Sequence, residues 1–269
     1  MTTLARRLRA ERKQSQRRRV IKKVALAVIV VSIALSGFLG LIFSKRFQVS
    51  TFEVSGSKRV SEEDIRTYVD EWLSQKRFLF FSERLYWFLD SDALVRGMQE
   101  SFPQLRAVRA QKNFPNRLSI AVEEYEGWGV LCHKEPEECF WIDHGGVAFD
   151  PAPGFTGVIV PKVRDERERD VKLGERQLSD ALMRLITYFN DRAVSDADLQ
   201  SIEFVIAARD ETIRIKTRAG WEILLLENTD PERAYKNLRI AIDADIKEKI
   251  ANLAYIDLRF GNKIFYKFR

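Results

Sequence analysis

The stretch FPQLRAVRAQKNFPNRLSIAVEE, residues 102–124, decides the architecture of the first folded part of this chain. Apolar and polar side chains alternate on both sides of the segment NFPN (residues 113–116), which is rich in turn-forming residues. The pattern predicts two strands, Leu105–Lys112 and Arg117–Glu124, joined by this turn. This strand pair closes a small module whose other elements lie upstream.

The upstream segments predict one further strand and two helices. The segment FQVSTFEVSGSKRV (residues 47–60) predicts a strand, because Phe52 and Val54 alternate with Glu53 and Ser55, and Gly56 then turns the chain. Ser61 is a suitable N-cap for an amphipathic helix, and a second helix is predicted over Ser91–Glu100. An aromatic-rich stretch, RFLFFSERLYWFLD (residues 77–90), separates the two helices. The predicted order is therefore β-α-α-β-β, which suffices for one small α/β module.

Nearer the N-terminus, the segment VALAVIVVSIALSGFLGLIF (Val24–Phe43) has twenty residues and no charge. As a helix it would span roughly 30 Å, the thickness of the hydrocarbon core of a bilayer. Residues 1–23 carry a net charge of +9, whereas the rest of the chain carries −3. The positive-inside rule therefore predicts a cytoplasmic basic tail and an extracytoplasmic segment from residue 47 onward. A cleaved signal peptide is the alternative, but its apolar run is usually only about 7–15 residues long.

The basic tail predicts a lipid partner rather than a nucleic acid. Its cations can bind anionic lipid headgroups, and contact with a cytoplasmic protein is a possible addition. Nucleic-acid binding is disfavoured, because no aromatic residues are interleaved with the cations and no folded platform lies beside them.

From Tyr125 onward the pattern changes to short strands and long amphipathic helices, so that the whole chain is predicted to be α+β. The mixed-charge run RDERERDVKLGER (Arg164–Arg176) is most simply a solvated loop. The predicted strands are Gly129–Cys132, Cys139–Ile142, Ser201–Ala207, Thr212–Thr217 and Glu222–Leu226, and the predicted helices are Gln177–Asn190 and Pro231–Ile250.

The final stretch YIDLRFGNKIFYKFR (Tyr255–Arg269) also alternates, around the pair Gly261-Asn262. This pair can form a two-residue hairpin turn, or Gly261 can introduce a bulge into one long strand. A hairpin would pair Phe260 with Lys263 and Leu258 with Phe265 on one face. The opposite face would then carry Tyr255, Asp257, Arg259, Ile264, Tyr266 and Phe268.

The two cysteines and the two histidines lie together in the segment CHKEPEECFWIDH (residues 132–144). A disulfide between Cys132 and Cys139 would close the tip of a hairpin, outside the reducing cytosol. Two free thiols are one alternative. Zinc binding by Cys132, His133, Cys139 and His144 is another, but Cys132 and His133 are adjacent and would point to opposite faces of a strand. A catalytic Cys-His pair is disfavoured, since nothing nearby would lower the pKa of the thiol.

No other pattern in the sequence indicates catalysis. The chain has no G-x-S-x-G, H-E-x-x-H or glycine-rich phosphate-binding motif. Asp143, Asp150 and Asp257 are interpreted as turn and surface residues rather than as an acid/base pair. We therefore predict no enzymatic activity, no metal and no cofactor.

Four segments of the chain resemble the bacterial cell-division family FtsQ, called DivIB in many Gram-positive bacteria. They occur in the family's order behind one membrane helix. The segments are FEVSGSKRVSEEDI (52–65), FPQLRAVRAQKNFPNRLSIAVEE (102–124), FWIDHGGVAF (140–149) and YIDLRFGNKIFYK (255–267).

The resemblance implies four regions: a basic cytoplasmic tail (1–23), a transmembrane helix (24–43), a POTRA domain (47–124) and an FtsQ-type β-domain (125–269). It also implies a non-enzymatic scaffold at the division septum, anchored in the cell (inner) membrane, that binds FtsB- and FtsL-like proteins and helps to recruit and control septal peptidoglycan synthesis. The POTRA domain would bind other division proteins. A partner strand would add to the sheet edge near the C-terminus. The expected partner-binding residues are Tyr255, Arg259, Phe260, Ile264, Phe265, Tyr266 and Phe268.

Two other functional classes stay open from the sequence. An envelope assembly or secretion factor can also use a POTRA domain, although such proteins usually carry tandem copies or a β-barrel. A membrane-anchored envelope enzyme would need a polar cleft with a perturbed acid or a metal.

Overall fold

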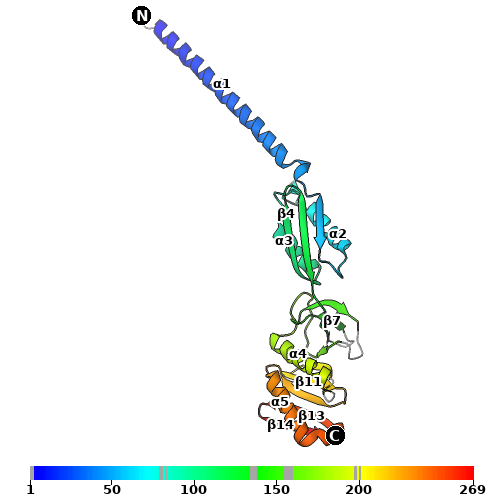
Figure 1. The fold of residues 1–269 in the computed structure, drawn as a ribbon. Coiled ribbons are helices and arrows are strands. Elements are labelled where there is room, and N and C mark those ends of the chain that lie inside the picture. Colours follow the sequence, from blue (N-terminus) through cyan, green and yellow to red (C-terminus); the bar gives the residue numbers. More distant parts are fainter. Residues whose placement is uncertain are drawn as a thin grey trace. The chain divides into compact units, whose positions relative to one another are not determined.

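The computed structural model describes residues 3–78, 81–82, 84–133, 138–153, 160–196, 199 and 201–269. The first element is the long helix α1 (Thr3–Ile42), drawn in blue in Figure 1. Within it, Ile21–Leu41 has a mean hydropathy of 2.6 and no buried side chains. By length and composition this segment can cross a membrane, as the uncharged run predicted. A single 3₁₀ turn, η1 (Lys45–Phe47), follows it.

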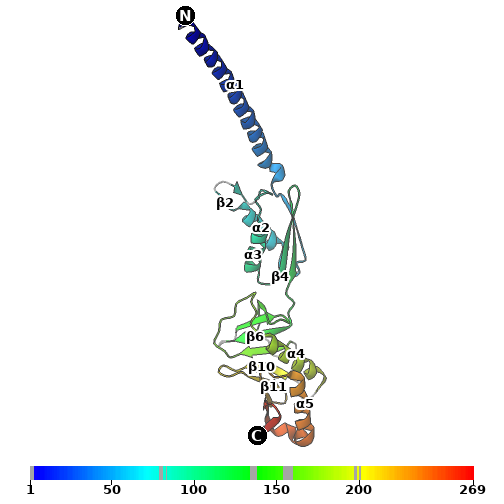
Figure 2. The same ribbon diagram turned by 90° about the vertical axis from the view of Figure 1, so that its left-hand side faces the viewer.

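The next folded part has the predicted β-α-α-β-β order (Figure 2). Its sheet has the strand order β1-β5-β4. The aromatic-rich stretch between the helices adds a short two-stranded hairpin. The elements are β1 (Thr51–Ser55), α2 (Glu62–Ser74), β2 (Lys76–Phe78), β3 (Phe81–Ser82), α3 (Ser91–Ser101), β4 (Leu105–Asn113) and β5 (Arg117–Glu124).

Local signals in the sequence account for these elements. Ser61 caps α2, because its Oγ accepts a hydrogen bond from the amide of Glu63 at 3.2 Å. Alternate residues of β5 are buried, which explains the period-2 pattern that predicted this strand. Gly56 turns the chain after β1 with a φ of +91°, a conformation that residues with a Cβ rarely adopt.

The turn after β1 is also fixed by a contact that the sequence did not indicate. The carboxylate of Glu124 accepts hydrogen bonds from the amides of Lys58, Arg59 and Val60 at 2.7–3.1 Å. Burial opposes ionisation of this carboxyl, but the three backbone donors outweigh it and hold the pKa of Glu124 below its usual value. Glu124 therefore stabilises the turn between β1 and α2.

The C-terminal part is built on a mixed nine-stranded sheet of order β14-β13-β12-β11-β10-β9-β6-β7-β8. Three neighbouring pairs in it are parallel: β13 with β12, β10 with β9, and β9 with β6. The strands are β6 (Gly129–His133), β7 (Glu138–Ile142), β8 (Ala148–Ala152), β9 (Lys162–Asp165), β10 (Ser201–Ile206), β11 (Thr212–Thr217), β12 (Glu222–Leu226), β13 (Leu253–Phe260) and β14 (Lys263–Phe268).

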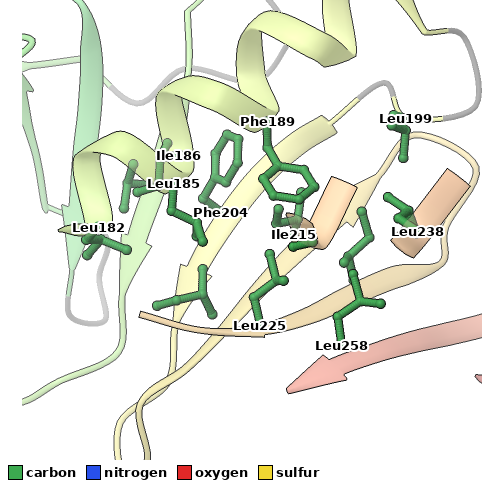
Figure 3. Packing of buried hydrophobic residues seen from close by; sticks show 14 of the residues in the cluster. Leu182, Leu185, Ile186, Phe189, Leu199, Phe204, Ile215, Leu225, Leu238 and Leu258 are labelled. Carbon is green, nitrogen blue, oxygen red and sulfur yellow. The ribbon is translucent and has the colours of Figure 1, made fainter. Parts of the chain in front are cut away.

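Helices α4 (Asp180–Ser195) and α5 (Pro231–Ala241) provide apolar side chains to the core of this sheet. Figure 3 shows leucine, isoleucine and phenylalanine side chains of α4 packed against those of the strands. α4 begins later than predicted, because Ser179 rather than an earlier residue caps it through the amide of Leu182 at 3.1 Å. α5 also ends earlier than predicted. The chain continues beyond it as a π-helical turn (Ile242–Ile246) and a 3₁₀ helix (Lys247–Asn252).

The interpretation of Arg164–Arg176 as a solvated loop is wrong at its beginning. Arg164 and Asp165 belong to β9, which runs between two parallel neighbours in the middle of the sheet. Asp165 is buried there, and its carboxylate accepts hydrogen bonds from the guanidinium groups of Arg167 and Arg169 at 2.6–2.9 Å. Asp165 can be buried because the arginines two and four residues later neutralise its charge and donate hydrogen bonds to it. A run of charged residues therefore does not by itself predict an exposed segment.

Candidate functional site

The two edges of the nine-stranded sheet differ in how far they are covered. At one edge, Ala148 of β8 accepts a hydrogen bond from the amide of Gly174 (2.7 Å) and donates one to the carbonyl of Glu175 (3.3 Å). The same strand contains Pro151, which has no amide hydrogen for an added strand. At the other edge, no backbone hydrogen bond joins the outer side of β14 to another segment among the described residues. β14 is therefore the candidate binding edge.

The structure shows that β13 and β14 form an antiparallel hairpin around Gly261-Asn262. Gly261 has a φ of +67°, as a hairpin turn requires, and the predicted pair Phe260–Lys263 closes it. The predicted pair Leu258–Phe265 is wrong, because Phe265 lies opposite Asp257. The register shifts twice along β13, between Leu253 and Tyr255 and between Asp257 and Phe260. Of the two alternatives, the hairpin is confirmed, and one long strand bulged at Gly261 is wrong, because both register shifts lie before Gly261.

The second shift is explained by a local contact within β13. The carboxylate of Asp257 accepts hydrogen bonds from the backbone amide, Nε and Nη2 of Arg259 at 3.1, 2.9 and 2.7 Å. Burial opposes ionisation of Asp257, but these donors outweigh it and hold the pKa of its carboxyl below the usual value. Arg259 also donates to Oγ1 of Thr212 at 3.0 Å. Asp257 is thus buried, and its interpretation as a surface residue is wrong.

The bulges change which residues share a face of the hairpin. Ile264 and Phe268 are half-buried and pack against the core with Leu253, Ile256 and Leu258. The prediction placed Ile264, Tyr266 and Phe268 on the face of Tyr255, Asp257 and Arg259. The observed pairs instead place Tyr266 opposite Ile256 and Phe268 opposite Leu253.

The side chains left exposed on the hairpin include three aromatic ones, those of Phe260, Phe265 and Tyr266. Phe260 and Phe265 lie edge to face with ring centroids 5.3 Å apart, and Phe265 keeps 50% of its surface exposed. Tyr266 contacts Phe268 in the same manner at 5.6 Å. Aromatic groups of this kind, half covered and rigid, commonly dominate the energy of protein interfaces.

The hairpin is fixed to the body of the sheet at both of its ends. At the turn, Asn237 of α5 donates a hydrogen bond to the carbonyl of Gly261 at 3.3 Å, and Arg233 donates to the side chain of Asn262. At the other end, the guanidinium of Arg269 donates to the carbonyl of Gly220, between β11 and β12. Since amides alternate in direction along a strand, we expect those of Ile264, Tyr266 and Phe268 to point away from β13. A partner strand would meet these three donors on a preformed edge.

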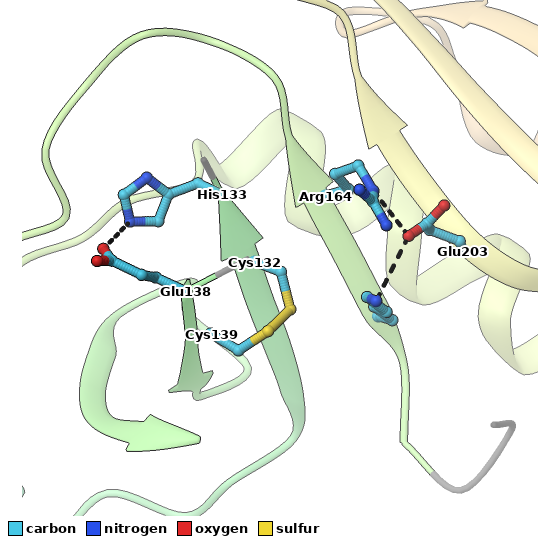
Figure 4. The surroundings of a disulfide bond; sticks show 7 residues. Cys132, His133, Glu138, Cys139, Arg164 and Glu203 are labelled. Carbon is cyan, nitrogen blue, oxygen red and sulfur yellow. Dashed lines mark hydrogen bonds and ion pairs between the residues drawn. A yellow bond between two sulfur atoms is a disulfide. The ribbon is translucent and has the colours of Figure 1, made fainter. Parts of the chain in front are cut away.

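A second group of chemically distinctive residues surrounds Cys132 and Cys139, which form a disulfide between β6 and β7 (Figure 4). His133 is buried beside it, with Nε2 3.6 Å from a carboxylate oxygen of Glu138. The imidazole of His144 instead packs against Trp128. The two sulfur atoms are bonded to each other. This arrangement does not fit a zinc site, in which both cysteines would have to be thiolates.

The buried carboxylate of Glu203 is part of an ion cluster rather than a catalytic pair. Arg164 Nε donates to it at 3.0 Å (Figure 4). Lys216 Nζ donates to it at 2.8 Å, and Lys162 Nζ lies 3.7 Å away. Burial opposes ionisation, but the hydrogen bonds from Lys216 and Arg164 outweigh it and hold the pKa of Glu203 below its usual value. An ionised carboxylate among three cations stabilises neighbouring strands and provides no acid or base that titrates near neutral pH.

Comparison with known proteins gives one family match and several relatives. Residues 47–125 match the family described as "POTRA domain, FtsQ-type". The chain is 25% identical over 222 residues to the cell division protein FtsQ of Myxococcus fulvus, a match that covers 80% of this chain and 72% of that protein. It is 26% identical over 142 residues to the cell division protein DivIB of Bacillus subtilis, covering 52% of this chain and 48% of that protein. It is 24% identical over 153 residues to the cell division protein DivIB of Lactococcus lactis, covering 57% of this chain and 37% of that protein.

Proposed function

We propose that this chain, which its FtsQ-type POTRA domain and its FtsQ and DivIB relatives assign to the FtsQ/DivIB family of cell division proteins, is a non-enzymatic divisome scaffold. Its extracytoplasmic part binds a segment of another division protein by strand addition to β14. The observation that carries this proposal is the uncovered aromatic edge of the nine-stranded sheet.

The proposed partners follow from the resemblance to the FtsQ/DivIB family and from the side chains exposed on β14. FtsB- and FtsL-like proteins are the proposed occupants of β14, and other division proteins would bind the POTRA domain. Lys263 and Lys267 are exposed on β14, so that an acidic partner segment would be favoured. The complex would help to recruit and control septal peptidoglycan synthesis.

The proposed topology follows from the charge on the two sides of the uncharged segment Val24–Phe43. Residues 1–23 form the basic cytoplasmic tail, and residues from 47 onward lie outside the membrane, as a POTRA domain (47–124) and a β-domain (125–269). The protein is then a single-pass protein of the cell membrane at the division septum, and its tail contacts anionic lipid headgroups.

Two substitutions at one position test strand addition directly. Tyr266→Pro removes a main-chain donor that we expect to point toward the partner, whereas Tyr266→Ala keeps this donor and removes only the side chain. We expect the proline variant to lose co-purification of the FtsB-like partner from dividing cells, and the alanine variant to retain it at a reduced level. Wild-type co-purification of a stably folded Tyr266→Pro chain would contradict strand addition at β14.

A different use of the POTRA domain, in envelope assembly or secretion, is separated by the same experiment. In that case the partners recovered with the wild-type chain would be secreted or outer-membrane proteins, and division proteins would be missing. A peptidoglycan-hydrolysis assay on the purified chain tests the enzyme alternative.

A further inference from the structure

Aromatic residues of the segment after α1 and of two neighbouring segments form a partly exposed cluster that strand addition at β14 does not use. It consists of Phe47, Tyr86, Trp87 and Phe114, with ring centroids 5.4–6.3 Å apart. Phe114 is 64% exposed and Trp87 is 51% exposed. Exposed aromatic residues are common singly, but a contiguous group of them marks a contact surface.

Hydrogen bonds hold the three segments of this aromatic cluster together. The amide of Tyr86 donates to the carbonyl of Phe47 at 2.9 Å, and the amide of Val49 donates to the carbonyl of Arg84 at 2.7 Å. The amide of Ser50 donates to the carbonyl of Asn116, in the turn that carries Phe114, at 3.2 Å. The cluster is therefore a built surface and not a set of independent side chains.

The distance along the chain determines what can cover this surface. The apolar part of α1 ends at Leu41, and Phe47 follows only six residues later. Even a fully extended chain of this length reaches about 20 Å. The 3₁₀ turn over Lys45–Phe47 shortens this reach. When α1 spans a bilayer, the aromatic cluster must therefore lie at or close to the lipid headgroups.

The chemistry of the surface agrees with a lipid headgroup zone. Tryptophan and tyrosine are enriched at this depth, because each combines an apolar ring with a polar atom. Lys45 and Arg46 are exposed beside Phe47, and Lys112 Nζ lies 5.6 Å from the ring centroid of Tyr86. Cations next to aromatic rings suit the phosphates of anionic lipids.

From these observations we propose that the aromatic cluster binds the surface of the bilayer that α1 crosses. The rings of Trp87 and Phe114 enter the headgroup zone, and the neighbouring cations contact phosphate groups. This contact would fix the orientation of the POTRA domain on the membrane, independently of any partner bound at β14.

Quenching of tryptophan fluorescence by brominated lipid tests the proposal on the full chain. The protein is placed in nanodiscs of phosphatidylglycerol and phosphatidylethanolamine, with acyl chains brominated close to the headgroup or unbrominated. We expect brominated lipid to reduce the wild-type emission, Trp87→Phe to abolish this reduction, and the matched control Trp128→Phe to retain it. Equal quenching of the Trp87→Phe variant and the wild type would overturn the proposal.

A second pair of variants tests whether the whole cluster is in contact with lipid. Phe114→Asp places a charge on the surface, and we expect it to reduce the quenching of Trp87 by at least half. Phe265→Asp introduces the same charge at another half-exposed phenylalanine and should leave the quenching unchanged. Circular dichroism establishes that both variants are folded. If the cluster is covered by protein, or by nothing, bromination has no effect on any variant, and the proposal is wrong.

Discussion

Replacing Phe265 by alanine separates the binding role of β14 from its structural role. The side chain of Phe265 is 50% exposed, so roughly 75–125 Å² of its aromatic surface is left for a partner to cover. At about 25 cal/mol per Å², complete coverage contributes roughly 2–3 kcal/mol to binding. The loss in affinity should therefore be about 20- to 150-fold.

The stability of the chain should fall as well, because half of the Phe265 side chain is already buried in the free chain. This half, roughly 75–125 Å², contributes roughly 2–3 kcal/mol at about 25 cal/mol per Å². The edge-to-face contact with Phe260 adds about 0.5–1.5 kcal/mol, so we expect the free energy of unfolding to fall by roughly 2.5–4.5 kcal/mol.

Biolayer interferometry on the full chain in nanodiscs, with an immobilised FtsB-like partner, measures the affinity, and guanidinium titration measures the stability. Phe114→Ala, at an exposed phenylalanine of the POTRA domain, is the matched control and should bind as the wild type does. Wild-type affinity of the Phe265→Ala variant would refute the assignment of β14 as the binding edge.

Three further predictions concern stability. Asp257→Asn should cost roughly 1.5–3 kcal/mol at pH 7. Because the folded-state pKa of Asp257 is lowered, the stability that its carboxylate contributes is present above a pH of about 4 and is lost as the pH falls through that pKa. The free energies of unfolding of the wild type and of the Asp257→Asn variant should therefore converge in acid denaturation. Replacing Cys132 and Cys139 by alanine should lower the free energy of unfolding, measured by guanidinium titration, by roughly 2–3 kcal/mol. A reducing agent should lower the free energy of unfolding of the wild type by the same amount. Gly261→Ala should lower the free energy of unfolding only by the roughly 1–2 kcal/mol that a positive φ costs a residue with a Cβ. The Gly56→Ala variant should melt at a clearly lower temperature, because the Cβ of the new alanine would lie 2.1 Å from a backbone carbonyl oxygen.

The sequence predicted those elements whose signals are local. Arg117–Glu124, Thr212–Thr217 and Glu222–Leu226 were predicted with the bounds that the structure has. The first two alternate clearly, and the third is a short apolar run bounded by turn residues. β8 and β9 were missed. β8 contains a proline, and β9 is four residues long with three charged residues, so neither has the alternation of a half-buried strand.

At the candidate site the sequence indicated a hairpin as one of two alternatives and did not give its register. Gly261-Asn262 is a recognisable turn signal, whereas the shift at Asp257 depends on a carboxylate that bonds to the amide two residues later. A side-chain contact of this kind changes the pairing without changing the alternation of apolar and polar residues. The faces of β14 could therefore be assigned only from the structure.

The covered backbone of Ala148 and the proline at position 151 also affect stoichiometry. A sheet that accepts a strand at one edge only binds one partner segment per chain and cannot grow into a chain of linked sheets. The competing reaction is then the pairing of β14 with β14 of a second copy, which would occupy both sites in a closed two-fold dimer. Partner binding and self-association at this edge should therefore exclude each other.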